Sequence, residues 1–571
     1  MEHSFPQEKT FFSILIIIPL LIVSSLAFGQ EIDSVHFSKQ ADQLFRDHIE
    51  DSEPGAAVVV IEKGQPVFKR CYGLANVEHQ IPVTSATVFN LASVSKQFTA
   101  LSILLLENEG KINLDDDIHI YLPELPPYEK TVTVRHLLNN TSGIWEYWTI
   151  MHSYAGYTRY DYYTLDEVMA LLKQQEKLLF DPGSQWSYCN TNYVLLAQIV
   201  SSVTGQSFVN WTTEHIFDPL GMAHSFFHEN SFQMIPKRAT PYRKKNQGVL
   251  TIAEDNRNNY AGQGYLYTTI DDMMLWMDNF RSKQLGGNVV IEKMFQKGQL
   301  NSGSESFYGF GLGILTLNGK MVIHHSGQTG GYKAVMLYCP ENEVGITILA
   351  NERSFDVERI GDRLFALYLG IEPEQKKESG SDQEDYITID SSRVKDYVGA
   401  FLIDGHASKL AFCQIGENTF YGILEGLGQD KFYPLSDMEF TTSNRRVTLE
   451  FVPDDINQLN QIKLDLKGDI HWAARIDFEP LSRAELSEAF SGDYYSHQLS
   501  TVYEVMAKGD RLHLKHRRYD DRIFSQIGED EFAGGYGILR FVRDADQRVC
   551  GFEIFDEYFN YQPLHFDRIG D

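Results

Sequence analysis

The chain has 571 residues, which is too long for one hydrophobic core, so we expect two to four domains. Apolar and charged residues make up 43% and 22% of the chain, as in ordinary globular proteins. The formal net charge of −28 excludes a basic nucleic-acid-binding surface, because phosphate binding needs clustered Lys and Arg. The five cysteines are scattered without zinc-ligand spacing, so the sequence predicts no metal site and no other cofactor.

The N-terminus has the pattern of an export signal. Lys9 precedes an apolar stretch over 11–26, and Ala27 and Gly29 are the small residues expected before cleavage at Gln30. We therefore predict a signal peptide over 1–29 and a periplasmic or secreted bacterial protein with no stable membrane span after cleavage. The stretch is also long enough for an uncleaved membrane anchor, which is the alternative.

The next part of the chain alternates strands and helices. Residues 34–50 carry apolar side chains at helical spacing, and the apolar runs 55–61 and 66–72 predict a β-hairpin around Gly64. Further strands are predicted at 312–317, 321–325, 333–339 and 344–350, followed by a helix over 356–369. Strands at both ends with helices between them imply one α/β domain over 30–371, whose two ends share a sheet.

Composition changes after residue 371. Residues 372–385 contain no large apolar side chain, which is typical of a linker. Beyond it, short alternating strands broken by Gly, Asp and Asn predict an all-β region. Residues 394–401 resemble 486–494, so we expect two units, 386–480 and 481–571, forming two small antiparallel barrels or one two-part β domain.

The tetrapeptide Ser93-Val94-Ser95-Lys96 opens an apolar run that predicts a buried helix. Its spacing puts the Ser93 hydroxyl and the Lys96 amine one turn apart on the same face. A serine hydroxyl becomes nucleophilic when a base takes its proton, and a desolvated lysine amine can be that base. Taken alone, the motif is better explained by a capping serine and a solvated lysine, because Ser-x-x-Lys recurs by chance in long chains.

A second cluster follows the turn at Pro182-Gly183. Tyr188 and Asn190 lie on the loop that enters an apolar helix. A tyrosine beside a lysine ammonium would have its phenolate form favoured, which makes it a usable proton shuttle. The Asn190 amide can hold that lysine and a substrate amide. Taken singly, these residues also fit a packed aromatic loop with a capping asparagine.

A third cluster joins a predicted strand to a glycine-rich turn. Gly327 allows a ligand to approach an edge-strand backbone closely, and the N–H of Gln328 can donate to an oxyanion. His325 would then be a polar or cationic group beside the substrate. Its neighbour His324 points to the opposite side of the strand, so the two are not a metal pair. The alternative is an ordinary glycine hairpin with a solvated histidine.

Together, the three clusters resemble the serine β-lactamase and penicillin-binding protein superfamily, in particular its class C-like branch of D-alanyl-D-alanine carboxypeptidases, D-aminopeptidases and esterases. The stretches 133–144, 203–205, 219–222 and 262–264 also fit, so the resemblance covers about 35–370. It implies an αβα sandwich with a mainly antiparallel sheet, a helical lobe, and a site between them. The roles it implies are Ser93 as nucleophile, Lys96 as base, Tyr188 as proton relay, Asn190, His325, Gly327 and Gln328 as substrate-binding residues, and the N–H groups of Ser93 and Gln328 as oxyanion hole.

The chain departs from the superfamily pattern at several positions. Asn140 replaces a usual His, Cys189 a common Ser, and Gly330 a usual Pro. His325 replaces the Lys of many relatives, which weakens the fixed positive charge that holds a β-lactam or peptide carboxylate. This difference favours an esterase or D-peptidase over an efficient β-lactamase.

The β region resembles the two lipocalin-like barrels that follow the catalytic domain in bacterial D-aminopeptidases, where a barrel loop can reach the cleft. The aromatic stretch 145–163 is expected to line that cleft. The sequence therefore predicts an exported serine hydrolase that forms an acyl-enzyme on small amides or esters, with D-amino-acid peptides, including cell-wall-derived ones, as candidate substrates. An esterase or weak β-lactamase using the same site, a catalytically silent binding protein, and a wall-anchoring role for the β region are the alternatives.

Overall fold

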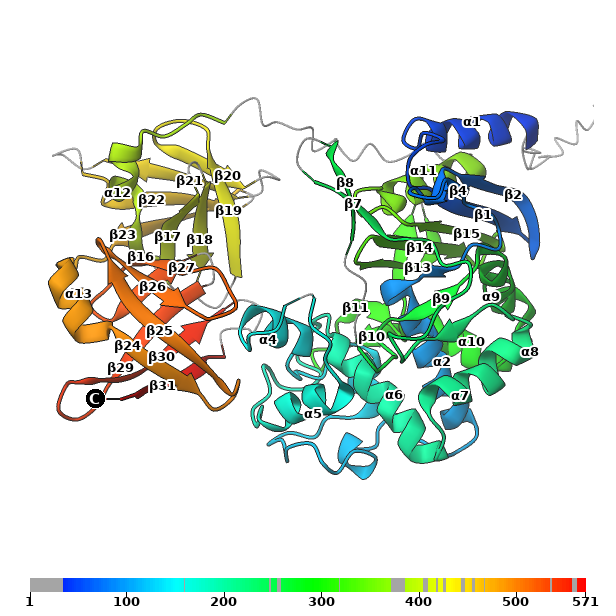
Figure 1. Cartoon of the computed structure of the whole chain (residues 1–571), viewed down its shortest axis with the longest axis horizontal. Coiled ribbons are helices and arrows are strands. Elements are labelled where there is room, and N and C mark those ends of the chain that lie inside the picture. Colours follow the sequence, from blue (N-terminus) through cyan, green and yellow to red (C-terminus); the bar gives the residue numbers. More distant parts are fainter. Residues whose placement is uncertain are drawn as a thin grey trace, which may run out of the picture.

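The computed structural model consists of an α/β part followed by two β-barrels (Figure 1). It describes residues 34–158, 160–245, 248–253, 258–317, 319–370, 386–403, 409–416, 419–424, 428–442, 447–453, 458–466, 468–534, 537–556 and 562–570. The predicted signal peptide, 1–29, and the predicted linker, 372–385, lie outside these residues. No helix within the described ranges is long and apolar enough to cross a membrane. All five cysteines are unpaired thiols.

An eight-stranded antiparallel sheet forms the centre of the α/β part. Its strands, in spatial order, are β10 (Lys297–Gln299), β11 (Glu305–Gly309), β12 (Gly313–Leu317), β13 (Lys320–Thr329), β14 (Tyr332–Cys339), β15 (Val344–Ala350), β1 (Ala56–Glu62) and β2 (Gln65–Tyr72). β1 pairs with β15, with Ala56 opposite Ala350, so the two ends of this part do share one sheet, as the sequence predicts.

Helices cover both faces of the sheet because its inner strands are apolar on both sides. In β1, Ala57, Val59 and Ile61 belong to one buried cluster, whereas Ala56, Val58 and Val60 belong to the other. The second cluster is closed by α1 (Ser34–Arg46) and α11 (Val357–Leu369), which lie together on the outer face (Figure 1). The first is closed by α2 (Lys96–Asn108), α9 (Ile270–Ser282) and α10 (Gly287–Met294).

A helical lobe is inserted between β5 and β9. It contains α3 (Val134–Leu138), α4 (Tyr147–Ser153), α5 (Leu165–Lys173), α6 (Asn190–Thr204), α7 (Phe208–Thr212) and α8 (Asp218–Leu220), with short turns η1 (Ala92–Ser95), η2 (Ile118–Ile120) and η3 (Thr213–Phe217). Three small sheets lie outside the main sheet: β3 (Leu74–Asn76) with β4 (Ile81–Pro82), β5 (Phe89–Asn90) with β9 (Leu266–Thr268) and β6 (Phe226–Phe227), and β7 (Tyr242–Lys244) with β8 (Leu250–Ile252). The predicted sandwich with a helical lobe is confirmed.

The C-terminal region consists of two closed eight-stranded barrels. The first contains α12 (Val394–Tyr397), β16 (Gly399–Ile403), β17 (Lys409–Gly416), β18 (Thr419–Leu424), β19 (Gly428–Pro434), β20 (Glu439–Thr442), β21 (Val447–Val452), β22 (Gln461–Leu466) and β23 (Asp469–Arg475). The second contains α13 (Arg483–Phe490), β24 (Gly492–Ser496), β25 (Thr501–Lys508), β26 (Arg511–Lys515), β27 (Arg522–Gln526), β28 (Glu531–Gly534), β29 (Gly537–Arg543), β30 (Val549–Phe555) and β31 (Leu564–Ile569).

The faint sequence repeat corresponds to the start of each barrel, where a short helix leads into the first strand. The helix α12 enters β16, and α13 enters β24. Aromatic rings fill the first barrel: Phe412 packs with Phe440 and Phe451 at centroid distances of 5.3 and 5.6 Å. The two barrels meet through a small apolar cluster that includes Ala411 of β17 and Ala533 of β28.

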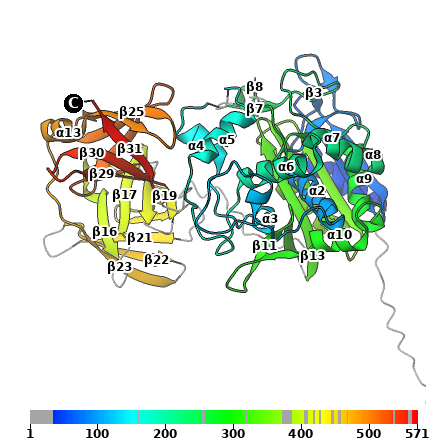
Figure 2. The same cartoon turned by 90° about the horizontal axis from the view of Figure 1, so that it is seen from below.

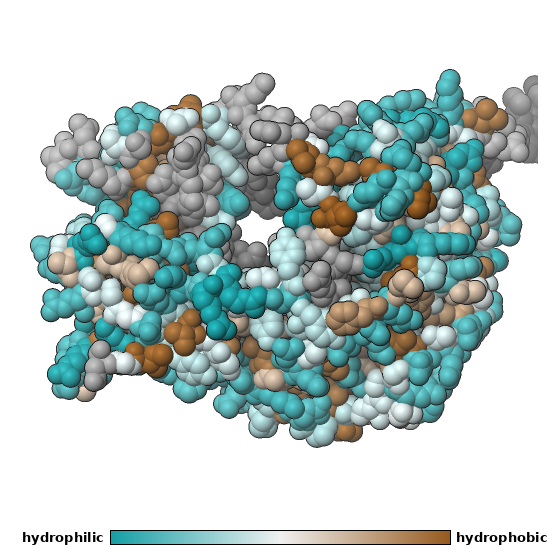
Figure 3. All heavy atoms as spheres, viewed as in Figure 1, coloured by the Kyte–Doolittle hydropathy of each residue, from teal (hydrophilic) through white to brown (hydrophobic). Residues whose placement is uncertain are grey.

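The second barrel contacts the helical lobe. Both cartoon views place α4 and α5 beside the barrel formed by β24–β31 (Figures 1 and 2), and the molecular surface is continuous at that point (Figure 3). The buried cores of this barrel and of the α/β part form one cluster. The second barrel is therefore packed onto the α/β part, in contrast to a domain tethered only by a linker.

Candidate active site

The turn that carries Ser93 is fixed by its backbone surroundings. Ala92 has a φ of +48°, a left-handed conformation that costs about 1–2 kcal/mol in a residue with a Cβ, and its N–H donates to Asn90 Oδ1 at 2.8 Å. β13 passes so close that a Cβ on Gly327 would lie 2.9 Å from the backbone nitrogen of Ser93. The strained turn thus presents Ser93 at the start of α2, half-exposed, beside the backbone of β13.

Lys96 is completely buried and points back to Ser93. Its Nζ lies 3.1 Å from Ser93 Oγ, 2.8 Å from Asn190 Oδ1 and 2.7 Å from the backbone oxygen of Gln263. The last two oxygens can only accept hydrogen bonds, so in the neutral amine both N–H groups are used and the lone pair faces Ser93. Burial lowers the pKa of Lys96 to about 7, against an opposing effect of the Glu146 carboxylate. The capping serine and solvated lysine of the alternative interpretation are not what the structure shows.

Tyr188 lies beside Ser93, Lys96 and His325. Lys96 Nζ lies 4.8 Å from the centre of its ring, and its hydroxyl is in hydrogen-bonding contact with Ser93. Its side chain is 37% exposed, which leaves one side open to the cleft. Desolvation raises the pKa of Tyr188 well above its usual value. The phenolate is therefore not the favoured form, because desolvation outweighs the hydrogen bond from Ser93 and keeps the proton on the phenol.

His325 is buried, not solvated, with 7% of its surface exposed. Its Nδ1 lies 2.6 Å from the Ser326 carbonyl oxygen and must carry the proton, so Nε2 accepts from the Tyr308 hydroxyl at 3.2 Å. Burial, with Lys96 nearby, lowers the pKa of His325 to about 3. Of the two expected forms, polar or cationic, the neutral polar one is therefore favoured. His324 occupies the opposite face of β13, against Gly313, as its position in the strand predicts.

The glycine-rich segment is more extended than the sequence suggests. β13 continues through Gly327 and Gln328 to Thr329, and the turn lies at 330–331. β13 is an inner strand of the sheet, but β12 pairs with it only as far as His324, so the part beyond is a local edge. What approaches Gly327 is the turn of Ser93 itself, since a Cβ there would lie 2.4 Å from the Leu91 oxygen. This contact brings the backbones of Ser93 and 327–328 together.

Comparison with known proteins identifies the family. The β-lactamase family model matches residues 41–370, more than half of the chain. This chain belongs to the β-lactamase family. Among curated relatives, it is 28% identical over 324 residues to a D-aminopeptidase of Gluconobacter oxydans, covering 56% of this chain and 60% of the relative, and 27% identical over 438 residues to a penicillin-binding protein of Bacillus subtilis, covering 72% and 93%. The match thus spans less than two thirds of the D-aminopeptidase.

A solved structure supports the same assignment. The octameric penicillin-binding protein homologue from Pyrococcus abyssi superimposes with a TM-score of 0.55 at 25% identity, covering 77% of this chain and all of that one. A D-stereospecific amidohydrolase from Streptomyces, at 22% identity and a TM-score of 0.50, shares the fold.

Within this β-lactamase-family site, Glu146 is a residue that motif analysis missed. Its carboxylate accepts hydrogen bonds from the backbone and side-chain nitrogens of Asn190, the latter at 3.3 Å, and from the Trp148 N–H at 3.2 Å. It also lies within electrostatic range of Lys96. The available signal was a single acidic residue in the aromatic run 145–148.

Tyr308 is the second missed residue. It is 3% exposed and connects His325 with the ring of Tyr188, whose centroid lies 6.3 Å away. The available signal in the sequence was the alternation of aromatic residues and glycines over 307–311. In the structure, a Cβ on Gly311 would lie 2.8 Å from the backbone oxygen of Lys96, so the position requires a glycine. Gly311 lets the turn between β11 and β12 pass close to the start of α2.

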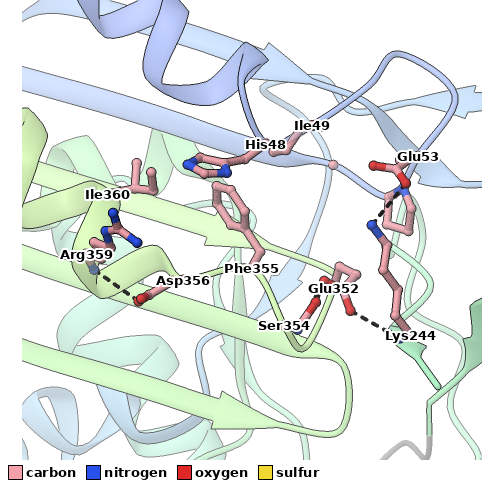
Figure 4. Close-up of a pocket in the computed structure, with 12 residues that line it drawn as sticks. His48, Ile49, Glu53, Lys244, Glu352, Ser354, Phe355, Asp356, Arg359 and Ile360 are labelled. Atoms are coloured by element: carbon pink, nitrogen blue, oxygen red, sulfur yellow. Dashed lines mark hydrogen bonds and ion pairs between the residues drawn. The ribbon is translucent and has the colours of Figure 1, made fainter. Parts of the chain in front are cut away.

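A separate cavity of about 280 Å³ lies at the end of the sheet, between α1, α11 and β7 (Figure 4). Among its charged groups, Lys244 Nζ binds Glu53 at 3.0 Å, and Asp356 accepts the backbone N–H of Arg359 as the cap of α11. None of its lining residues belongs to the site around Ser93. The described residues also contain no cluster of three potential metal ligands.

Proposed function

We propose that this protein is a serine hydrolase in which Ser93 forms an acyl-enzyme with Lys96 as general base. The observation that carries the proposal is the buried Lys96 amine, whose two N–H groups are used by Asn190 and Gln263 while it lies 3.1 Å from Ser93 Oγ. With a pKa of about 7, a large fraction of this amine is neutral at neutral pH and can accept a proton.

In each half of the proposed reaction, one net proton passes from the attacking group to the leaving group, by way of Lys96 and Tyr188. Ser93 Oγ attacks the acyl carbon while its proton passes to Lys96, and the oxyanion receives hydrogen bonds from the N–H groups of Ser93 and Gln328. The Tyr188 phenol then gives its proton to the leaving nitrogen or oxygen and is reprotonated by Lys96. In the second half, water attacks the ester carbon, and its proton passes through the same groups to Ser93 Oγ as the bond from Oγ to the acyl carbon breaks. The acid product leaves and Ser93 is regenerated.

We further propose that the substrate carries a free amino group beside the scissile bond, as in a D-amino-acid amide or the N-terminus of a D-peptide. The site supports this because Glu146 places an acidic group beside Asn190 and within electrostatic range of Lys96, where hydrogen bonds from Asn190 and Trp148 oppose the rise in its pKa caused by burial. His325, in contrast, is neutral and supplies no cation for a substrate carboxylate. The similarity to a D-aminopeptidase points in the same direction. Carboxypeptidase and β-lactamase activities both need a carboxylate to be held, so they are disfavoured.

The first experiment tests the acyl-enzyme. Intact protein is treated with a fluorophosphonate, and the adduct is located by peptide mass spectrometry. We expect a single adduct on Ser93, and none in Ser93→Ala with an unchanged circular dichroism spectrum. A folded protein that never reacts at Ser93 would support the catalytically silent binding protein instead.

The second experiment tests the substrate class with matched pairs. D-Alanine p-nitroanilide is compared with its N-acetyl form, and a D-Ala-D-Ala peptide, a p-nitrophenyl ester and nitrocefin complete the panel. The free amine should be preferred in kcat/KM by about tenfold or more, a difference that Glu146→Gln should reduce. Equal rates for the free and acetylated substrates would exclude amine recognition and favour the esterase alternative.

We also propose that residues 1–29 direct export and are cleaved, because Lys9 and the apolar stretch that follows have the pattern of a signal peptide. The N-terminal residue of the protein purified from the periplasm of an expressing bacterium tests this. Gln30 at the N-terminus is the expected result, and an intact Met1 in the membrane fraction would show an uncleaved anchor.

A further inference from the structure

The second barrel binds the segment that follows α4 through a fully buried tyrosine. Tyr154 is 0% exposed, its hydroxyl donates to Asp556 of the barrel, and its backbone oxygen accepts from the Tyr503 hydroxyl at 3.0 Å. Asp556 is itself only 3% exposed. A carboxylate this deeply buried is stable only when it is hydrogen-bonded, so this contact is part of the folded structure and not a loose surface encounter.

Arg522 completes the contact from the other side of the ring. Its guanidinium group is 4% exposed, donates to the Ser153 carbonyl oxygen, and lies 4.8 Å from the centre of the Tyr154 ring. The barrel thus places a buried cation and a buried anion on one tyrosine of the helical lobe. Truncating one partner of such an arrangement costs more than losing an exposed ion pair, because the other charge stays buried.

The barrel also recognises the backbone beyond Tyr154. The Tyr519 hydroxyl accepts from the Gly156 N–H at 2.8 Å and lies 3.0 Å from the Met151 oxygen. Gly156 has a φ of +89°, and a Cβ there would lie 2.7 Å from His516, so the imidazole needs a glycine opposite it. Part of the stretch 145–163 is therefore occupied by barrel contacts and does not line the cleft as expected from its composition.

The same short helix connects this interface to the active site. α4 spans Tyr147–Ser153, and Glu146 is its N-cap, accepting from the Trp148 N–H. At its other end, the Tyr154 N–H donates to the Ile150 oxygen at 2.9 Å. A helix of this length is a rigid rod of about 10 Å, so its two ends move together. Glu146 binds Asn190 at one end, and the barrel binds Ser153 and Tyr154 at the other.

We propose that the second barrel positions Glu146, and through it Asn190 and Lys96, by holding the C-terminal end of α4 with Tyr154, Asp556 and Arg522. These three are positioning residues, since none touches the reacting atoms. The proposal rests on the proposed function at Ser93. It gives the barrel a direct part in catalysis that a wall-binding accessory would not have.

The pH profile provides a readout specific to this role. The groups facing Lys96 are Glu146, Cys189, the rings of Tyr188 and Tyr193, and neutral His325. Of these, Glu146 is the one that α4 carries, and its negative charge raises the pKa of Lys96. If Glu146 moves away, the pKa of Lys96 falls, and the acidic limb of kcat/KM shifts to lower pH.

The experiment uses the full chain and the single-atom change Tyr154→Phe. We expect kcat/KM to fall by about threefold to tenfold and its acidic limb to shift to lower pH. Glu146→Gln should shift the limb in the same direction by a larger amount. Adding Tyr154→Phe to Glu146→Gln should produce no further shift, because the effect acts through Glu146. Arg522→Lys, which keeps the charge but changes its geometry, should reproduce the Tyr154→Phe shift.

The matched control is Tyr494→Phe. Tyr494 is also 0% exposed in the same barrel, but its hydroxyl donates to the Phe490 oxygen at 2.8 Å, within the barrel. Tyr494→Phe should lower the melting temperature without shifting the acidic limb of kcat/KM. The barrel has only a structural role if Tyr154→Phe lowers activity while the acidic limb stays in place. The same conclusion follows if Tyr154→Phe shifts the acidic limb equally in the Glu146→Gln background. Fluorophosphonate labelling of Ser93 in each variant separates this outcome from failure of the acyl-enzyme proposal.

Discussion

Gly327→Ala tests whether the close approach of β13 to the nucleophile turn sets the catalytic geometry. The added Cβ would lie 2.4 Å from the Leu91 oxygen and 2.9 Å from the Ser93 nitrogen, whereas Cβ contacts below 3.0 Å are essentially never observed. The turn must therefore move by at least about 0.6 Å, the difference between 2.4 and 3.0 Å. Misplacement of a catalytic group by about 1 Å can reduce the rate about a hundredfold.

We therefore expect Gly327→Ala to fold and to acylate about tenfold to a hundredfold more slowly, which corresponds to about 1.4–2.7 kcal/mol of lost transition-state stabilisation. The assay is the rate of fluorophosphonate labelling at Ser93, with circular dichroism as the check on folding.

The matched control is Gly331→Ala, in the same hairpin. Its Cβ would lie 2.4 Å from the backbone nitrogen of Tyr242, an equally close clash that is directed at β7 and not at Ser93. It should cost stability and leave the acylation rate within about threefold of the unchanged protein. Equal slowing in both variants, or no slowing in Gly327→Ala, would refute the argument that this contact positions Ser93.

Three further predictions concern charge. If the neutral Lys96 amine is the base, as we propose, its pKa of about 7 predicts that kcat/KM for an uncharged ester rises with pH through about 7; a rate independent of pH across that range would contradict the assignment. His325→Lys should increase acylation by a labelled penicillin by about tenfold, because it restores a cation for the carboxylate, while His325→Gln, the neutral control, should not. Burial lowers the folded-state pKa of His325 from 6.5 to about 3. The contribution of the neutral His325 to the free energy of unfolding is therefore fully present above about pH 6.5 and is lost as the pH falls toward 3. Urea titrations should show the free energy of unfolding decline by at most about 5 kcal/mol over this range, and by less in His325→Gln.

Local pattern was sufficient for much of the fold and for the placement of Ser93 beside Lys96. The spacing of Ser93 and Lys96 places them on one helical face whatever surrounds them, and the continuous apolar run of β1 requires cover on both sheet faces. The short repeated motif at 394–401 and 486–494 marks the start of each barrel because a helix-to-strand entry is a local feature.

The protonation states could not be read in the same way. Residue type and neighbours predict a favoured phenolate for Tyr188 and a polar or cationic His325, whereas both groups are neutral because burial disfavours their charged forms. Desolvation depends on everything packed around a group, including Tyr308, which joins the site from a distant strand. A motif contains no information about that packing.

The sequence by itself determined which residue types stand at each motif, the helix that presents Ser93 and Lys96, and the order of sheet, helical lobe and barrels. The tertiary structure decided that Glu146 and Tyr308 join the site, that Lys96 loses its proton near pH 7, and that the second barrel binds Tyr154. The physical reason is range: helical and strand periodicity is set by neighbours along the chain, whereas burial and contacts between residues hundreds of positions apart exist only after the chain has folded.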